Sequence, residues 1–319
     1  MIKMSARPVP TKYQCYLAAF FSVILWGTSF AVVKFVMPVS LNILAFTALQ
    51  TFIGTIFLFV LLGIKGELKA WFAVLRRNNW KYLLIGICCY SGAYLVQYWG
   101  LSLTTAINQS VISNTQTFWV LAFNVWVFKS RPSRIFIGGS FLAFFGVVVL
   151  LSTPGNFFSF STATIIGDLI SILAFVLWGA YTSFSQPLSV KEPPIHVIAS
   201  IFFWGNLVLV PFLFLFGGWS QIEQVTLIQW GIMVYLGIGC ASLVLILWAI
   251  GLSNPAIPSE KISLITMLTP LVGIITSVLL LGETLTPNAI LGCTIILGGM
   301  FIANWDEYSA LLKRKPAKN

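Results

Sequence analysis

The stretch GDLISILAFVLWGAYT occupies residues 167–182 and is apolar apart from Asp168 and a few small hydroxyl side chains. Its Leu177-Trp178-Gly179 repeats Leu25-Trp26-Gly27, which lies 152 residues earlier in a second apolar segment. A repeat at a fixed offset indicates a duplicated structural unit. The stretch therefore predicts that the chain is built from two copies of one unit.

The composition of the whole chain is too apolar for a water-soluble protein. Hydrophobic residues make up 58% of the 319 positions and charged residues only 8%, whereas roughly a quarter of a soluble domain is charged. A helix that spans a bilayer needs about 20 apolar residues. The composition excludes soluble enzymes, disulfide scaffolds and disordered proteins, and it predicts an all-α polytopic membrane protein embedded in the lipid bilayer.

Ten apolar segments can be read along the chain, five on each side of the polar stretch 153–164. They are 16–37, 42–63, 80–101, 104–127, 134–152, 165–185, 195–216, 229–252, 256–281 and 286–304. We therefore expect a first repeat over 1–152, an external linker over 153–164, a second repeat over 165–304 and a basic tail over 305–319. Because five is an odd number, the second copy must cross the membrane in the opposite sense, as an inverted repeat.

The distribution of basic residues predicts the orientation of the chain. With ten spans and a cytoplasmic N-terminus, 16 of the 18 Lys and Arg residues lie on the cytoplasmic side, as the positive-inside rule requires. Lys34 and Lys261 lie at the ends of spans. We expect a multi-pass protein of the plasma (inner) membrane with both termini in the cytoplasm. Short basic clusters between apolar runs are topology signals, so the net charge of +10 predicts no nucleic-acid partner.

One connection between segments has a pattern of its own. The stretch 66–78 reads GELKAWFAVLRRN, and Leu68, Trp71, Phe72 and Leu75 recur at helical spacing. An amphipathic helix with basic residues on its other face suits a membrane surface. The pattern predicts a short helix on the cytoplasmic surface of the bilayer.

Three stretches carry a resemblance to a known family. They are LWGTSFAVVK (25–34), GDLISILAFVLWGAYT (167–182) and the TP…LLLGETLT stretch (269–286). Together they resemble the EamA-type branch of the drug/metabolite transporter superfamily, over residues 16–304. The resemblance implies ten helices, cytoplasmic termini, a central cavity between the halves and, often, export of amino acids or related metabolites. Many relatives carry an Arg in the second segment, where this chain has Gln50.

The fourth segment, 104–127, is unusually rich in amides and hydroxyls. Gln109, Ser113, Gln116 and Thr117 recur at steps of three and four residues, so they are expected on one stripe of one helix. Polar groups inside a span usually face protein or a watery cavity. Two interpretations stay open: hydrogen bonds that hold the helices together, or side chains that line a substrate pathway.

Aromatic residues and one adjacent charge pair add further candidates. Tyr94 and Gln97 lie three residues apart in the third segment, where they can face the same cavity. Trp26 and Trp178 occupy equivalent places in the two halves and suit either helix packing or a shared cavity wall. Glu260 and Lys261 begin the ninth segment after Pro255 and Pro258. We expect Lys261 to face the cavity opposite Asn108, its equivalent in the first half, where a substrate carboxylate could bind.

These candidates favour one function over two others. The five cysteines and the single His196 form no metal-ligand pattern, and neither a catalytic motif nor a nucleotide-binding motif is present. No catalytic residue, metal or cofactor is therefore predicted. The leading interpretation is a secondary transporter for a small polar metabolite. A membrane structural or assembly protein and an intramembrane enzyme remain the alternatives.

Overall fold

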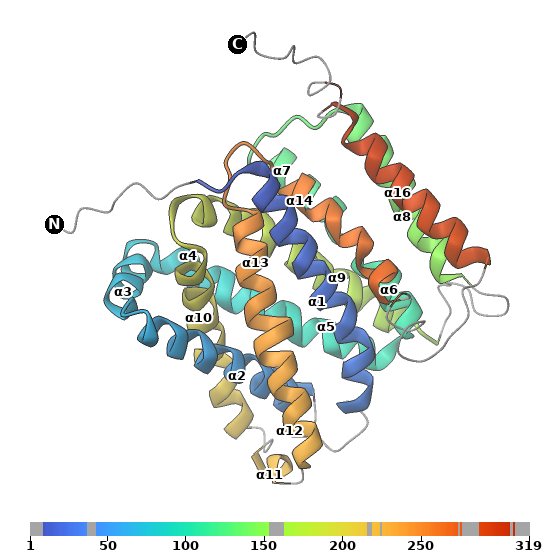
Figure 1. Ribbon diagram of the computed structural model, residues 1–319. Helices are drawn as coiled ribbons and strands as arrows, with labels where there is room; N and C mark the ends of the chain where they lie inside the picture. The colour runs from blue at the N-terminus through green and yellow to red at the C-terminus, as the bar shows by residue number, and fades with distance from the viewer. Residues whose placement is uncertain are drawn as a thin grey trace.

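The computed structural model describes residues 9–36, 43–152, 163–215, 219–223, 225–273, 275, 287–306 and 309. Throughout these residues the secondary structure is helical and no strand occurs (Figure 1). The side chain of Lys34, most of the expected linker 153–164, the end of the ninth segment and most of the basic tail lie outside the described part.

The helices follow the expected segments in both halves. The first half contains α1 (Lys12–Val36), α2 (Ile43–Ile64), α3 (Leu68–Arg77), α4 (Asn79–Leu84), η1 (Ile85–Ser91), α5 (Gly92–Leu103), α6 (Ala106–Ser113), α7 (Gln116–Trp126) and α8 (Arg134–Leu151). The second half contains α9 (Ile165–Lys191), α10 (Pro194–Leu215), α11 (Trp219–Ile222), α12 (Leu227–Val234), η2 (Tyr235–Leu243), α13 (Val244–Gly251), α14 (Ser259–Leu264), η3 (Ile265–Leu268) and α16 (Pro287–Ala303).

Five helical stretches are long and apolar enough to cross a membrane. Within the described residues they are Ile43–Ile64, Arg134–Leu151, Ile165–Lys191, Pro194–Pro211 and Leu227–Gly251, and Pro287–Ala303 is a shorter apolar helix. The structure is therefore that of an all-helical protein with several membrane-length apolar helices.

The two halves share their irregular stretches as well as their helices. The third expected segment contains the π-helical stretch η1, and the eighth contains the π-helical stretch η2 at the equivalent place. The fourth segment is divided between α6 and α7, and the ninth contains the 3₁₀ turn η3. Departures from α-helical geometry inside long helices often mark functional sites.

The division of the fourth segment corrects one expectation. Gln109 and Ser113 lie on α6, whereas Gln116 and Thr117 lie on α7, so they do not form a stripe on one continuous helix. The side-chain amide of Asn114 donates to the backbone carbonyl of Ser110 across 2.7 Å, next to the break. Such local side-chain bonds compete with the helical hydrogen-bond pattern.

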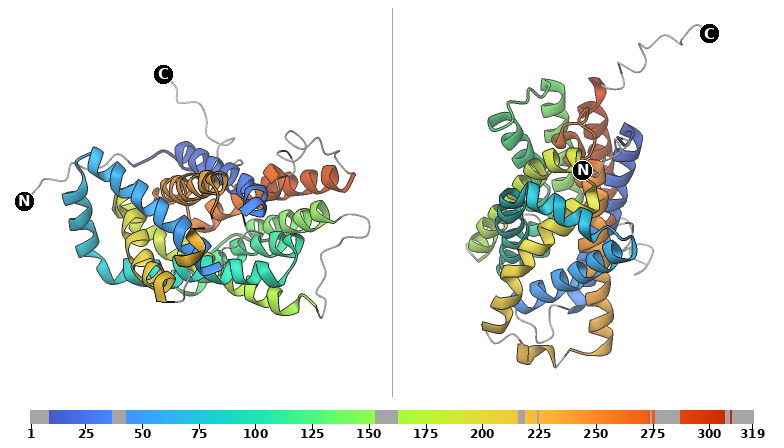
Figure 2. Two further views of the ribbon diagram at one scale, coloured as in Figure 1. Left: turned by 90° about the horizontal axis from the view of Figure 1, so that it is seen from below. Right: turned by 90° about the vertical axis from the view of Figure 1, so that its left-hand side faces the viewer.

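Helix pairing relates the halves to each other. Helix α8 packs on α16, α2 on α10, α7 on α14, α5 on α9, and α1 on α13. The ribbon views show α8 and α16 side by side at one edge of the molecule (Figures 1 and 2). Exchanging the first half with the second converts the pairs α8–α16 and α2–α10 into themselves, and it converts α5–α9 into α13–α1. The packing therefore follows the repeat read from the sequence.

Close glycine contacts recur at equivalent places in the two halves. A Cβ atom on Gly54 would lie 2.5 Å from the hydroxyl oxygen of Ser242, and one on Gly205 would lie 2.5 Å from that of Ser91. Gly54 and Gly205 are 151 residues apart, as are Ser91 and Ser242. Each contact brings a helix of one half against the π-helical stretch of the other, at a distance that only a glycine permits.

Helix α3 is the amphipathic helix expected in the connection 66–78. Trp71, Val74 and Leu75 are buried against the bundle, whereas Leu68 and Phe72 are exposed. The guanidinium of Arg76 lies 4.7 Å from the centre of the Phe72 ring. The helix therefore has one apolar face on the protein and exposes both apolar and basic groups on the other.

Candidate functional site

A layer of aromatic rings joins the two halves in the middle of the bundle. The Trp26 ring of α1 lies 6.4 Å from the Trp178 ring of α9 and 5.4 Å from the Trp248 ring of α13, centre to centre. The Tyr94 ring of α5 lies 5.0 Å from Trp178. Four helices, two from each half, thus contribute to this aromatic layer, and it contains the expected residues Trp26, Trp178 and Tyr94.

The amides of the third and fourth segments extend the layer along one side of α9. The indole N–H of Trp178 donates to the side-chain carbonyl of Gln97 across 2.7 Å. The Gln109 amide donates to the backbone carbonyl of Gln97 across 3.2 Å and accepts a bond from the hydroxyl of Ser171. These bonds bring two expected residues, Gln97 and Gln109, to the same face of α9.

Gln116 reaches the same helix closer to its C-terminal end. Its amide N–H and the indole N–H of Trp248 both donate to the hydroxyl of Thr182, each across 3.3 Å. Gln116 is 6% exposed and Thr182 is fully buried. Ser113 lies on α6 and donates to the backbone carbonyl of Ser110 across 2.8 Å. The fourth segment thus bonds to α9, and through Thr117 and Asn124 it bonds to α14 as well.

Asn108 lies at the other end of α9, beside a fully buried carboxylate. Its amide donates to both carboxylate oxygens of Asp168, across 3.0 and 3.1 Å. The hydroxyls of Thr104 and Thr164 also donate to Asp168. The buried carboxylate is therefore satisfied by neutral donors, and it links the start of the fourth segment to the start of the sixth.

The expected pairing of Lys261 with Asn108 is not seen. Asn108 contacts Asp168 near the start of α9, whereas Lys261 lies at the start of α14, next to residues that contact the last turns of α9. About twenty residues of helix, or roughly 30 Å, separate those two parts of α9. The two residues therefore do not share one site.

Two hollows meet at Glu260, at the end of the bundle where α14 begins. The larger is about 340 Å³ and lies between α7, the end of α9 and the turn before α14; the smaller is about 230 Å³ and is also lined by Lys261 and Arg131. Glu260 lines both hollows and is 3% exposed. Of the two adjacent charges, the carboxylate is thus the more deeply placed, whereas the expectation favoured Lys261.

Several residues of the site were absent from the sequence expectations. Trp248, Thr182 and Gln186 make inter-helix contacts around the aromatic layer and the larger hollow. Trp248 lies 151 residues after Gln97, so the repeat offset could have identified it as the equivalent of a candidate. Thr182 and Gln186 follow Trp178 at four-residue steps, which places them on its face of the helix.

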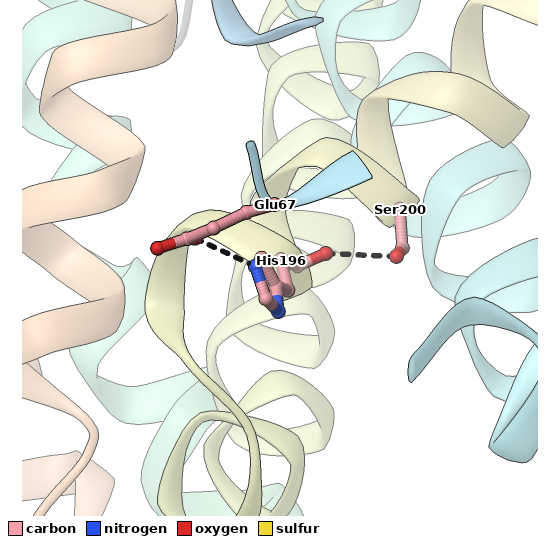
Figure 3. Close-up of polar contacts among 3 residues, drawn as sticks. All are labelled: Glu67, His196 and Ser200. Atoms are coloured by element: carbon pink, nitrogen blue, oxygen red, sulfur yellow. Dashed lines mark hydrogen bonds and ion pairs between the residues drawn. The ribbon is translucent and has the colours of Figure 1, made fainter. Parts of the chain in front are cut away.

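A second polar cluster fixes the two ends of α3 to the start of α10 and to the end of α9. The carboxylate of Glu67, just before α3, lies 2.9 Å from the Nε2 atom of His196, whose backbone carbonyl accepts a bond from Ser200 (Figure 3). At the other end of α3, Arg77 donates to the buried carboxylate of Glu192 across 2.8 Å. The first half is thereby clamped to the second at both ends of α3.

Known proteins with similar sequences are transporters. The chain is 26% identical to an uncharacterized transporter of Archaeoglobus fulgidus, with 72% of this chain and 78% of the relative covered. It is 25% identical to the uncharacterized transporter YwfM of Bacillus subtilis over 90% of both chains. It is also 26% identical to a protein of Salmonella typhimurium named "Probable amino-acid metabolite efflux pump", over 60% of this chain and 65% of that protein.

Structure and family comparisons give the same assignment of fold. A crystal structure that covers 95% of this chain and all of its own superposes with a TM-score of 0.77 at 20% sequence identity, which shows a common fold. The sequence pattern of one transporter family matches this chain twice, over residues 14–152 and 165–305. The resemblance read from the sequence is thus confirmed, and the chain belongs to the EamA-like transporter family.

Proposed function

We propose that this protein is a secondary transporter with ten spans, which moves small polar metabolites across the plasma (inner) membrane by alternating access. Amino acids and their derivatives are the leading substrate class. Both termini and α3 lie in the cytoplasm, and the linker 153–164 lies outside. The two halves, 1–152 and 165–304, act as inverted repeats that rock about the aromatic layer.

The observation that carries this proposal is the symmetry of the packing around the aromatic layer. Each half contributes one tryptophan, Trp26 or Trp178, at equivalent positions, and each half carries a π-helical stretch against the other half. Because the two halves are copies of one unit, each half can adopt the packing of the other. The site then opens first to one side of the membrane and then to the other. A structural or assembly protein has no need of this exchange.

The chemistry of the aromatic layer supports a small organic substrate. Tyr94, Trp26 and Trp178 offer ring faces for stacking and for cation–π contact with an ammonium group. Gln97, Gln109 and Gln116 offer neutral donors and acceptors, which can fix orientation without a net charge. The name of the Salmonella relative and the family resemblance support amino-acid metabolites as cargo and export as the direction.

Transport by purified protein in liposomes tests this function. Preloaded vesicles should exchange a labelled amino acid faster than vesicles without protein, and the rate should saturate with concentration. Gln109→Leu and Gln116→Leu should reduce transport per folded molecule more than they reduce thermal stability, because an amide at the pathway contributes to specificity. Loss of stability with unchanged transport per folded molecule would assign both amides to helix packing instead.

A further inference from the structure

The larger hollow beside Glu260 has one acidic and one basic residue in its wall. Its charged lining residues are Glu260, at the start of α14, and Lys191, at the end of α9. Glu260 is 3% exposed, whereas the side chain of Lys191 is exposed. The hollow is therefore negatively charged at its buried end and positively charged at its rim.

Glu260 is a buried carboxylate whose described partners are all neutral. It accepts hydrogen bonds from the amide of Asn124 and, across 3.4 Å, from the hydroxyl of Ser130. Within the described part of the chain, no lysine or arginine forms an ion pair with it. A buried charge is costly unless it is paired, and an ionised carboxylate can accept about four hydrogen bonds. Glu260 thus keeps hydrogen-bonding capacity for a ligand cation.

A proline in α9 adds a second acceptor to the same wall. Pro187 lies inside α9 and lines the hollow. Because proline has no N–H, the carbonyl of Ser183, four residues earlier, lacks its helical donor. Ser183 also lines the hollow. Pro187 therefore leaves a main-chain acceptor in a residue of the wall that also holds the carboxylate of Glu260.

The residues around Glu260 are held by a network between three helices. The Gln186 amide donates to the carbonyl of Ile257 across 2.7 Å and accepts from the N–H of Ser259 across 3.1 Å, which fixes the turn before α14 to α9. On α7, the carbonyl of Asn124 accepts from the N–H of Ser130 across 3.0 Å. The acidic end of the hollow is thus built before any ligand binds.

The remaining walls and the size favour a small ligand with an apolar part. Phe128, Val190, Pro255 and Pro258 provide apolar surface around the charged pair. A volume of about 340 Å³ is at the low end of the range of about 300–1,000 Å³ that is usual for ligand pockets. Such a hollow fits a single amino acid better than a peptide or a drug-sized molecule.

We infer that this hollow is a binding site for a zwitterionic amino acid, with the ammonium at Glu260 and the carboxylate at Lys191. The inference rests on the proposed transport function and deepens it. In the proposed orientation the hollow opens toward the cytoplasm, where Lys191 lies, so it would collect an exported amino acid before the aromatic layer. The hollow lies near the last turns of α9 and is separate from the aromatic layer, in which Gln97 bonds to Trp178.

Calorimetric titration of the purified full-length protein tests both charges separately. The probes are L-leucine, L-phenylalanine and L-threonine, each with its methyl ester, which lacks the carboxylate, and its N-acetyl form, which lacks the ammonium. We expect at least one of the three amino acids to bind roughly tenfold or more tightly than either of its blocked forms, because each blocked form loses one charge-assisted hydrogen bond. If none of the three binds, or if the blocked forms bind equally well, the assignment is overturned.

Variants then connect each charge to its residue. In Glu260→Gln the free amino acid should no longer bind more tightly than its N-acetyl form. In Lys191→Gln it should no longer bind more tightly than its methyl ester. Glu223→Gln and Lys69→Gln, at exposed positions outside the hollow, are matched controls that should keep both preferences. If Glu260→Gln does not fold, Lys191→Gln decides the result, because that side chain is exposed. Unchanged preferences in Lys191→Gln would contradict the site.

Transport of the same amino acids distinguishes this inference from the proposed function. Suppose that the wild-type protein transports the amino acid and that both variants still bind the free amino acid more tightly than its blocked forms. This result would reject the hollow as the site and would leave the transport function in place. Charge-dependent binding that is lost in the variants, without transport by the wild type, would support the site and count against the transport function.

Discussion

The indole N–H of Trp178 donates to the side-chain carbonyl of Gln97 across 2.7 Å, and this bond connects the second half of the protein to the first. The equivalent positions in the other half are Trp26 and Trp248, whose rings lie 5.4 Å apart. One side of the aromatic layer is therefore polar and the other is fully aromatic. A symmetric fold thus surrounds an asymmetric layer, and under the proposed function this layer can orient a substrate that has one polar and one apolar end.

Removing the bond between Trp178 and Gln97 should weaken substrate binding. We expect Trp178→Phe and Gln97→Leu each to raise the KM for transport roughly fivefold, since one such bond contributes about 1 kcal/mol. The double variant should be little worse than either single variant, because the bond is lost only once. Trp26→Phe, at the equivalent position, is the control, and an equally large effect there would show that the bond itself has no special role.

The small-residue contact between α8 and α16 should determine stability. A Cβ atom on Gly139 would lie 2.3 Å from the backbone N atom of Ala303, whereas one on the adjacent Gly138 would meet no atom within 4 Å. Gly139→Ala should therefore lower the free energy of unfolding by about 1–3 kcal/mol through overpacking, and Gly138→Ala should change it little. Thermal unfolding of both variants in the same detergent measures the difference. Equal stabilities would mean that the two helices can separate without cost.

Some features of the fold could be predicted from the sequence, and others could not. The duplicated unit, the long apolar helices and α3 follow from periodicity and composition, because lipid requires every backbone group to be paired within a helix. The break between α6 and α7 coincides with local bonds of Asn114 and Thr115. The polar run 113–117 is visible in the sequence, but it does not show whether its side chains bond to their own helix or to a neighbouring one. The π-helical stretches coincide with close glycine contacts between the halves, which only the assembled bundle defines.

The candidate site was predictable in its composition but less so in its connections. Trp26, Trp178, Tyr94, Gln97 and Gln109 were identified because polar and aromatic groups stand out within apolar segments, and the structure brings these five together. The deep position of Glu260 relative to Lys261 was not predicted. Adjacent residues on a helix point about 100° apart, so the sequence shows that they diverge but not which one faces inward.

Loss of Arg77 should weaken the attachment of α3 to the second half, whereas loss of its neighbour Arg76 should not. Arg77→Gln removes the bond to the buried carboxylate of Glu192, but Arg77 is half exposed, so the expected loss of stability is about 1 kcal/mol. Backbone amides of α3 should also exchange hydrogen faster, because the helix is then held at one end only. Arg76→Gln, whose guanidinium lies over Phe72, is the control. Equal exchange in both variants would show that α3 is held by its buried apolar face alone.

Cysteine labelling at two equivalent connections tests most directly whether the two halves cross the membrane in opposite directions, as proposed. Lys69 of α3 and Glu223 of the loop after α11 are both exposed, and each follows the second helix of its own half. Each position is replaced by cysteine in a variant without the five native cysteines, and intact cells are treated with a membrane-impermeant maleimide. The inverted repeat predicts labelling at position 223 only, with the reverse result in inside-out vesicles. Labelling of both positions from the same side would contradict the inverted repeat and, with it, the proposed mechanism of alternating access.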